Sequence, residues 1–391
     1  MKQIVVVGIS HHNTLGVIRA LGRKGLSERM HLILIGNSDY ISCSRYVSAE
    51  RLYRVPDEST LVETLDISNI GSEENPAVVI CCSDSSIAIL DASRSLLNDR
   101  YILPSASSDY GGVQGLMGKD IQASIATKVG INIPDSTYLN VEDESFSISL
   151  EKWGCYPCIL KPIDSIQGHK TDIHICPNKS SLASDIKTSR CTKFIVQKFI
   201  DKDFEFQLIG CSLRGGEEVV LPGYTRIIRQ PDNTNTGFLQ YNPISNLDID
   251  STLAGVRSFL KRIEYSGLFS VEFLRGKDGI DYFMEINMRN DGNAICVTDA
   301  GMNLPFIWYA YNSGEDYYSE MVNEVKSLYC MPEFDDFVFV LKGKLSLGTW
   351  LRDVRKTQSF MEYSKDDKRP FYKKMRNFIG FLFKRLFKRH Q

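Results

Sequence analysis

The chain has 391 residues, of which 43% are hydrophobic and 24% charged, and its formal net charge is -2. This length is more than one simple core needs, so we expect two or three packed units. No apolar run is long enough to cross a bilayer, and the near-zero net charge offers no general attraction to nucleic acid.

Short apolar strands alternate with helices over the first hundred residues. We expect strands at Ile4–Val7, His31–Ile35 and Ala77–Cys82, and a helix at Thr14–Leu21. Such alternation predicts a parallel sheet with helices on both faces. The first strand is too short for the apolar core of a signal peptide, so we expect a cytoplasmic protein.

The ten cysteines have no regular spacing, which favours reduced thiols. One Cys-x-x-Cys pair, Cys155 and Cys158, leads directly into a predicted strand, whereas a redox pair should open a helix. We therefore predict that these two cysteines are packing residues.

The second part of the chain, after the loop-rich stretch 105–118, is predicted to contain mainly strands. A helix is expected at Lys119–Val129 and another between Ser251 and Ile263. Strands are expected at Cys158–Lys161, Ile173–Cys176, Phe194–Phe199, Glu205–Gly210, Glu218–Leu221, Phe269–Arg275 and Ile280–Asn287. The predicted fold class is α/β followed by α+β, and residues 237–246 are expected to form a loop between elements.

The most informative segment is SVEFLRGKDGIDYFMEINMR, residues 270–289. Asp278-Gly279 predicts a two-residue hairpin turn, which places Lys277 opposite Ile280 and Glu272 opposite Glu285. Facing side chains in such a pair lie about 5 Å apart at Cβ. A longer loop would place the two glutamates diagonally, still within reach of one ion.

Two facing carboxylates repel unless a cation lies between them. Glu272, Glu285 and the amide of Asn287 offer only oxygen atoms, which suits Mg²⁺, or Mn²⁺ in its place. Arg289 follows on the same side and is a candidate for holding a departing phosphate. The alternative is an ordinary solvated polar face.

Two lysines are candidate phosphate ligands. Lys161 ends an apolar strand, where burial requires an anionic partner, and Lys119 opens a helix, where backbone N–H groups also attract phosphate. The polar loop 164–170 could close over phosphates, and its His169 is a weak candidate for a phosphate or proton contact. Taken alone, each lysine is more typical of a surface residue than of a ligand.

The strand FIVQKFI, residues 194–200, could present backbone groups to an adenine edge, and Glu205 could accept hydrogen bonds from ribose hydroxyls. An ordinary edge strand is the alternative reading of this segment.

Taken together, these segments resemble the ATP-grasp superfamily, in particular its carboxylate–amine ligase branch with D-alanine–D-alanine ligase, D-aspartate ligase and carnosine synthase. The resemblance spans residues 1 to about 312. It is carried by GISHHNTLGVIRALGRKG at residues 8–25, MGKDIQASIATKVGINIP at 117–134, YPCILKP at 156–162, FIVQKFIDKDFEF at 194–206, SVEF at 270–273 and MEINMR at 284–289.

The resemblance implies an N-terminal Rossmann-like domain at 1–115, a two-lobed ATP-grasp domain at 116–312 whose lobes meet near 197–200, and a C-terminal extension at 313–391. Lys119 and Lys161 are then implied as phosphate ligands, and Gln197, Lys198, Ile200 and Glu205 as contacts of adenosine. Glu272, Glu285 and Asn287 are implied as metal ligands, and Arg289 and Lys161 as catalytic groups. Arg226 and Arg229 are weaker candidates for phosphate or substrate contacts.

The activity implied is ATP- and Mg²⁺-dependent phosphorylation of a small-molecule carboxylate to an acyl-phosphate, followed by condensation with an amine. This chemistry gives ADP and phosphate and needs no nucleic acid. Two alternatives remain open: a catalytically silent ATP-binding sensor of the same fold, and a dinucleotide-dependent oxidoreductase. The spacing of Gly8 and Gly16 does not fit the dinucleotide fingerprint. An oligomer is compatible with the sequence.

The C-terminal residues 368–391 carry nine Lys or Arg and no Asp or Glu. Their apolar residues recur at helical spacing, which predicts a basic amphipathic helix. Two roles are open for it: peripheral contact with the inner face of an anionic membrane, or packing against its own domain.

Overall fold

The computed structural model describes residues 1–162, 173–231 and 236–388. Its contacts form two compact units: unit 1 comprises residues 1–117, 206–271 and 286–391, and unit 2 comprises residues 118–205 and 272–285. The contacts thus group the chain differently from the division at 115 and 312, because the last hundred residues share a unit with the N-terminal segment.

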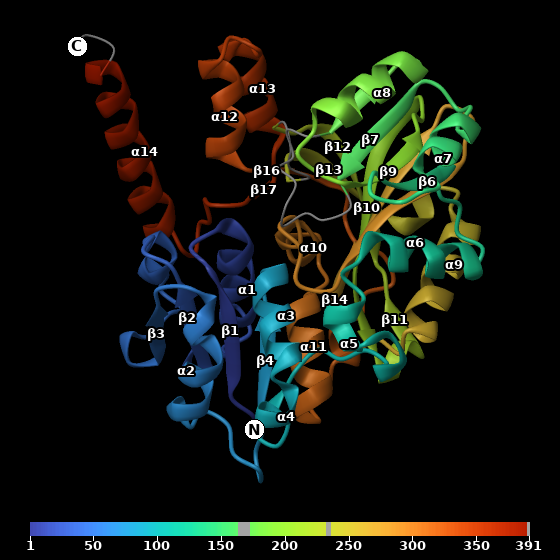
Figure 1. The fold of residues 1–391 in the computed structure, drawn as a ribbon. Coiled ribbons are helices and arrows are strands. Elements are labelled where there is room, and N and C mark those ends of the chain that lie inside the picture. Colours follow the sequence, from blue (N-terminus) through green and yellow to red (C-terminus); the bar gives the residue numbers. More distant parts are fainter. Residues whose placement is uncertain (163–172, 232–235, 389–391) are drawn as a thin grey trace. The chain divides into compact units, whose positions relative to one another are not determined.

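A parallel sheet of order β3-β2-β1-β4-β5 forms the N-terminal part of unit 1 (Figure 1). Its strands are β1 (Ile4–Ile9), β2 (Met30–Ile35), β3 (Leu52–Val55), β4 (Ala77–Cys81) and β5 (Tyr101–Ile102). All five residues of β4 are buried, as expected of a strand in a parallel sheet covered on both faces. The predicted α/β character of this region is confirmed.

The helices of this region are α1 (His12–Gly22), α2 (Leu61–Ser68), α3 (Asp84–Ala92), α4 (Arg94–Leu97) and α5 (Gly112–Gly115). Every residue of α1 is buried, because α10 (Ile295–Asp299) and α11 (Leu304–Ser313) pack against it. A Cβ added at Gly16 would lie 3.4 Å from Ile295, an ordinary van der Waals distance, so α1 and α10 are in direct contact at this position. The N-terminal segment therefore shares one core with residues near 300.

A second sheet has the order β15-β14-β10-β12-β13-β16-β17, with β11 paired to β10. Its strands are β10 (Lys202–Leu213), β11 (Glu218–Val220), β12 (Gly223–Arg229), β13 (Phe238–Pro243), β14 (Gly267–Gly276), β15 (Asp281–Asn287), β16 (Leu328–Met331) and β17 (Ser359–Phe360). Helix α9 (Asp250–Arg262) lies between β13 and β14 in the sequence. The expectation of a loop at 237–246 was wrong, because most of this segment is the buried strand β13, paired with β12 and β16.

Unit 2 contains an antiparallel sheet of order β6-β9-β7-β8. Its strands are β6 (Ser136–Asn140), β7 (Cys158–Pro162), β8 (His174–Cys176) and β9 (Lys193–Lys198), and its helices are α6 (Lys119–Lys128), α7 (Phe146–Lys152) and α8 (Lys179–Thr188). Cys158, Leu160, Phe194 and Val196 point into its core with Leu182 of α8. Cys158 lies in this core and Cys155 packs against it, so the prediction of two packing cysteines is confirmed.

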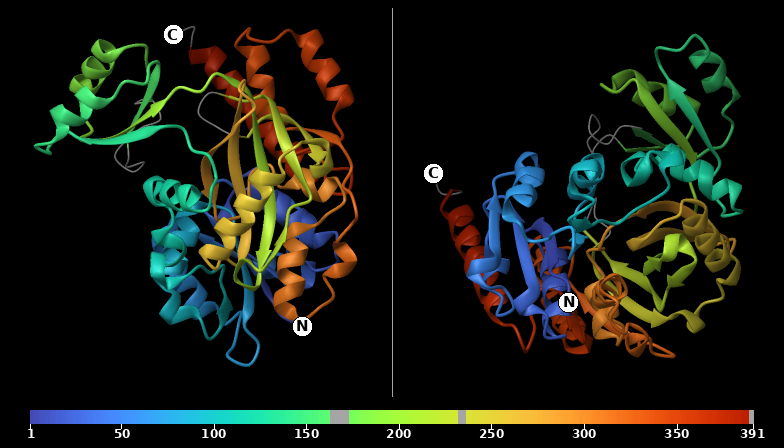
Figure 2. Two further views of the ribbon diagram at one scale, coloured as in Figure 1. Left: turned by 90° about the vertical axis from the view of Figure 1, so that its right-hand side faces the viewer. Right: turned by 90° about the horizontal axis from the view of Figure 1, so that it is seen from below.

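The C-terminal part of unit 1 consists of α12 (Glu333–Leu341), α13 (Leu347–Lys356) and α14 (Arg369–Lys388). The predicted tail helix is confirmed, and its first half packs on unit 1: the rings of Phe371 and Phe378 each lie 5.4 Å from that of Phe334. Lys374 forms an ion pair with Glu362. Figures 1 and 2 show α14 beside the 3₁₀ turn Tyr40–Cys43 of the N-terminal region. Within the described part of the chain, none of the helices has the length and apolarity needed to cross a membrane.

Candidate active site

The turn between β14 and β15 is longer than predicted. The N–H of Gly276 donates to the carbonyl of Ile280 at 2.9 Å, and the N–H of Gly279 donates to the carbonyl of Gly276 at 3.0 Å. The loop is therefore Lys277–Gly279, and the prediction of a two-residue turn with Lys277 opposite Ile280 was wrong. The physical reason is Asp278: its carboxylate accepts the N–H of Ile280 at 3.0 Å, and only Gly279 takes a positive φ, of 79°. A type I′ turn would need positive φ at both residues.

Glu272 and Glu285 nevertheless act on the same lysine. The ammonium of Lys119, the first residue of α6, lies 3.0 Å from Oε2 of Glu285. Burial alone would lower the pKa of Lys119, but the carboxylates of Glu285 and Glu272 raise it. Three of the predicted residues thus converge within unit 2, with Lys119 balancing the negative charge of the two carboxylates.

Lys161 lies on β7 and donates to the side-chain oxygen of Gln197 on β9 at 3.0 Å. The strand register places Gln197 opposite Ile159, two residues from Lys161. Burial and the positive charge of Lys119 lower the pKa of Lys161 to about 8. Two lysine side chains thus lie near each other in unit 2, which creates a place for an anion.

The segment predicted as an adenine hinge lies in the interior of the unit 2 sheet, since β9 pairs with β6 on one side and β7 on the other. The backbone N–H of Lys198 donates to the carbonyl of Asp135 at 2.8 Å, while its side chain is exposed. Ile200 is buried, and Glu205 forms an ion pair with Lys202. The N–H of Lys198 therefore forms a hydrogen bond within the sheet. The segment is an interior strand, not the edge strand considered as the alternative.

Asn287 and Arg289 belong to unit 1. The guanidinium of Arg289 donates to both carboxylate oxygens of Asp84, at 2.9 and 3.1 Å, and to the side-chain oxygen of Asn287 at 3.3 Å. Asp84 is the first residue of α3, so Arg289 is oriented at the carboxyl end of β4. The alternation of β15 keeps Asn287 on the same face as Glu285, two residues earlier.

The two weaker arginine candidates differ from each other. Arg229 donates to both carboxylate oxygens of Asp336 at 2.8 Å and to Asp353 at 3.0 Å. Its guanidinium also lies over the ring of Phe238, at 5.1 Å from the centroid. These contacts indicate that Arg229 supports the packing of α12 and α13, whereas Arg226, three residues earlier on β12, is exposed.

Solved structures with similar folds include a synthetase, a ligase and the biotin carboxylase domain of a carboxylase. N5-carboxyaminoimidazole synthetase from Staphylococcus aureus matches over 88% of this chain and 86% of its own, with TM-score 0.62 and 14% identity. L-amino acid ligase from Bacillus licheniformis matches over 84% and 78%, with TM-score 0.61 and 18% identity. The biotin carboxylase domain of 2-oxoglutarate carboxylase from Hydrogenobacter thermophilus, solved with MgADP and bicarbonate, matches over 81% and 70%, with TM-score 0.61 and 18% identity.

The chain has the ATP-grasp fold. No protein-family model matches it, and no curated protein matches it in sequence. The predicted resemblance and the mixed α/β fold class are confirmed at the level of the fold.

His169 and the loop 164–170 lie outside the described residues. The ATP-grasp resemblance therefore remains the basis for any role of this loop.

Several polar residues near the carboxyl ends of β1 and β4 had no predicted role. Asn13 donates to the carbonyls of Cys82 and Asn290, both at 2.9 Å, and Asn290 donates back to Asn13. In an open α/β sheet, ligands bind at this edge where the strand order reverses, here between β1 and β4. The sequence gave a partial indication of these residues, because NDGN at 290–293 directly follows MEINMR, the segment that carries Glu285 and Asn287.

Proposed function

We propose that the chain is an ATP-dependent, Mg²⁺-requiring ligase that activates a small-molecule carboxylate as an acyl-phosphate and joins it to an amine. The observation that carries this proposal is the convergence of Lys119, Lys161, Glu272 and Glu285 within unit 2 of an ATP-grasp fold. Two lysines beside two carboxylates form a surface that suits an anion and a cation bound together, as in a metal–nucleotide complex.

The donor set fits Mg²⁺. Glu272, Glu285 and Asn287 would hold it through oxygen atoms, the ligands that this ion prefers. The present ion pair of Glu285 with Lys119 shows that the carboxylates favour a positive partner. When bound, Mg²⁺ supplies charge neutralisation at the nucleotide phosphates.

The lysines would position the phosphates. Lys161 has a neutral amide as its hydrogen-bond partner and a pKa lowered to about 8. An anionic phosphate would stabilise its charged form, and Lys119 would act beside it. Fixed positive charge directed at a transferring phosphoryl group lowers the barrier without reorganisation during the reaction.

The proposed reaction has two steps. A carboxylate oxygen of the substrate attacks the γ-phosphorus as the bond to the β-phosphate oxygen breaks, and ADP leaves. The amine nitrogen then attacks the acyl carbon, the bond to the phosphate oxygen breaks, and the amine loses its proton. We propose that Arg289 contacts the phosphate that is formed. Before that step, Asp84 holds the guanidinium of Arg289 in orientation.

The similar solved structures support this class of reaction over the dinucleotide-dependent alternative. They include an L-amino acid ligase and carboxylases, and the dinucleotide-dependent reading has no comparable support. The tail enters the proposal as a part of unit 1 rather than as a membrane anchor, because Phe371 and Phe378 pack on Phe334.

The test is release of ADP and phosphate from Mg-ATP in the presence of pools of amino acids and small carboxylic acids. We expect at least one pool to stimulate release by the native chain and by Glu151→Gln, but not by Glu285→Gln. Glu151 is a suitable control because it is an exposed glutamate of unit 2, paired with Lys179.

ATP binding without stimulation by any pool would favour the sensor alternative. Binding of NADH without binding of ATP would refute the proposal and favour the oxidoreductase.

A further inference from the structure

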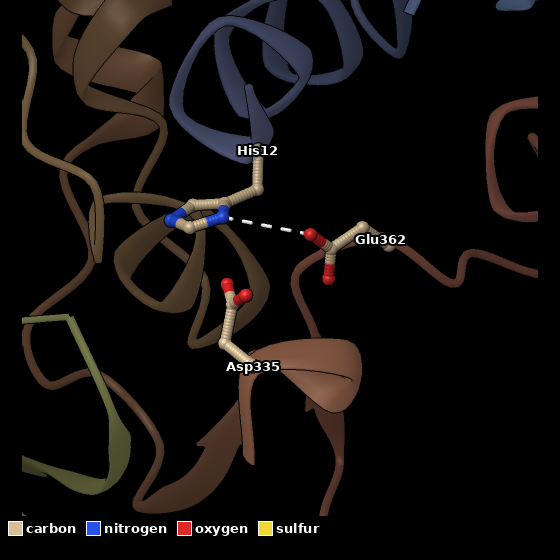
Figure 3. A group of neighbouring side chains, drawn as sticks. All are labelled: His12, Asp335 and Glu362. Carbon is tan, nitrogen blue, oxygen red and sulfur yellow. Dashed lines mark ion pairs between the residues drawn. The ribbon is translucent and has the colours of Figure 1, made fainter. Parts of the chain in front are cut away.

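A second group of possible metal ligands lies in unit 1, separate in sequence from the carboxylates of β14 and β15. It consists of His12 at the start of α1, Asp335 in α12 and Glu362 just after β17 (Figure 3). One ligand atom of each residue lies within 4.8 Å of the other two. Figure 3 shows the imidazole of His12 facing both carboxylates.

His12 is buried in a way that its own fold does not explain. The residue is 2% exposed, yet neither ring nitrogen has a hydrogen-bond partner among the residues that the structure describes. Buried polar atoms almost always have such a partner. His12 therefore points into the cluster without a conventional reason to be there.

The contact between His12 and Glu362 does not have the length of a strong ion pair. Nδ1 of His12 lies 3.5 Å from Oε1 of Glu362, whereas a charge-assisted N–H···O bond is about 2.7–2.9 Å long. Two ligands of one tetrahedral ion, each about 2.0–2.1 Å from it, are separated by about 3.3 Å. The observed spacing is closer to that of two ligands than to that of a donor and an acceptor.

The charges of the cluster leave room for a cation. Lys374 of α14 pairs with Oε1 of Glu362, so it offsets one of the two carboxylates. The other oxygen, Oε2 of Glu362, is buried and has no hydrogen-bond partner in the described part of the chain.

The backbone around Glu362 is fixed by a neighbouring residue. The N–H groups of Glu362 and Tyr363 donate to the carboxylate of Glu333 at 3.1 and 2.6 Å. The Glu362 side chain is thus held in place by the segment that carries it.

We propose that His12, Asp335 and Glu362 bind one divalent transition-metal ion of the zinc class. An imidazole with two carboxylates suits such an ion, whereas Mg²⁺ takes oxygen ligands. Three protein ligands leave at least one position open, as in catalytic zinc sites. The site lies at the first strand-to-helix turn of the parallel sheet, the edge at which small molecules bind.

A protonated His12 paired with Glu362 is the simple alternative. It would need acceptors for both N–H groups, and Nε2 has none among the described residues. An added Cβ at Gly292 would lie 3.6 Å from this nitrogen, so the atom faces the backbone of 292 rather than a carboxylate. A metal ion on Nδ1 would leave the ring neutral, with one N–H rather than two to satisfy, and this difference favours a metal over an ion pair.

The test uses the full chain, freed of metal by a chelator and titrated with Co²⁺ without nucleotide. We compare the native protein with His12→Gln, Asp335→Asn and Glu285→Gln, and with His31→Gln as a histidine control from the same unit. Affinity and stoichiometry come from calorimetry, and the ligand atoms from the visible and electron paramagnetic resonance spectra of Co²⁺.

We expect one Co²⁺ site with nitrogen coupling that persists in Glu285→Gln and His31→Gln. Its affinity should fall by about 10–100-fold or more in His12→Gln and Asp335→Asn. Loss of a residue that only hydrogen-bonds to a metal ligand already lowers affinity by about this factor. Asp335 is less buried than His12, so Asp335→Asn decides the matter if His12→Gln fails to fold.

Three results would overturn the proposal: no site, a site lost in Glu285→Gln but kept in Asp335→Asn, or thiolate-to-cobalt absorption, which would place the ion on cysteines. Because the readout is metal binding without nucleotide, failure here leaves the ligase proposal standing.

Discussion

Lys161 shows how a single buried cation can prepare a strand for an anionic ligand. Its amine is bonded to a neutral amide, and both burial and Lys119 disfavour its charge. The sequence indicated that a lysine ending an apolar strand needs an anionic partner, and the lowered pKa gives that argument a measurable consequence.

The first prediction concerns the pH dependence of ATP binding. Because the pKa of Lys161 is lowered to about 8, the side chain loses its proton as the pH rises through 8, and its attraction for phosphate is lost. We expect the Kd for Mg-ATP to rise up to about tenfold per pH unit above 8, measured by calorimetry from pH 7 to 9.5. Lys161→Arg stays charged and should flatten this dependence; an equally steep rise in that variant would contradict the assignment.

Arg229 differs from Lys161. It was a candidate ligand-binding residue, but its guanidinium is paired with carboxylates of α12 and α13. Asp336 beneath it is 1% exposed and accepts two hydrogen bonds from the guanidinium. The sequence alone could not reveal these partners, because Asp336 and Asp353 lie more than a hundred residues after Arg229.

The second prediction follows from this buried pair. Arg229→Met leaves the carboxylate of Asp336 without its cation, which should lower the free energy of unfolding by about 3–5 kcal/mol. Arg226→Met on the same strand removes an exposed charge and should change it by less than about 1 kcal/mol. Chemical denaturation compares the two; equal losses would show that burial of the pair is not the cause.

At the scale of elements, the β14–β15 turn contains one residue in the left-handed backbone region. Gly279 has φ of 79°, and an added Cβ would meet no atom within 4 Å. Any cost of a side chain there is therefore conformational rather than steric.

The third prediction tests that cost. Gly279→Ala should destabilise the protein by about 1–2 kcal/mol, the penalty for a left-handed conformation in an L-residue. Gly154 of the same unit is a matched control, because it also has open space around it but no positive φ, so Gly154→Ala should be close to neutral. Thermal unfolding of both variants decides; a stable Gly279→Ala would mean that the loop can adopt another turn.

The tail helix α14 was open to two interpretations from sequence. Its basic and apolar faces satisfy the pattern of a membrane-surface helix, and that pattern equally suits a helix lying on its own domain. Phe334 distinguishes them for the first half of the helix, since both Phe371 and Phe378 contact it.

The fourth prediction is that a chain ending at Asp367 loses stability. Removal of α14 exposes Phe334 and leaves Glu362, which is buried, without Lys374. We expect the Tm to fall by several degrees, with binding to anionic vesicles near zero for both forms. Salt-sensitive vesicle binding by the full chain, absent from the shortened one, would instead support the membrane role.

At the scale of the whole molecule, sequence order and spatial grouping diverge. Unit 2 is built from residues 118–205 together with the hairpin segment 272–285. Because residues 272–285 belong to this unit, Glu272 and Glu285 lie near Lys119, which precedes them by about 150 residues in the sequence. Consecutive domains cannot describe this arrangement. Strand pairing between distant segments brings them into one core, whatever their positions in the sequence.

The sequence by itself determined three strands of the parallel N-terminal sheet (β1, β2 and β4), strands β7, β8 and β9 of unit 2, and the two glutamates that converge on Lys119, because strand periodicity and short-range motifs are local properties. Only the tertiary structure decided the turn at Lys277–Gly279, the partners of Arg229 and the cluster of His12 with Asp335 and Glu362. The turn depended on whether Asp278 and Gly279 both take positive φ. Only Gly279 does, and the side chain of Asp278 instead accepts the N–H of Ile280. The other two depend on contacts between residues more than a hundred positions apart, which only folding of the whole chain brings together.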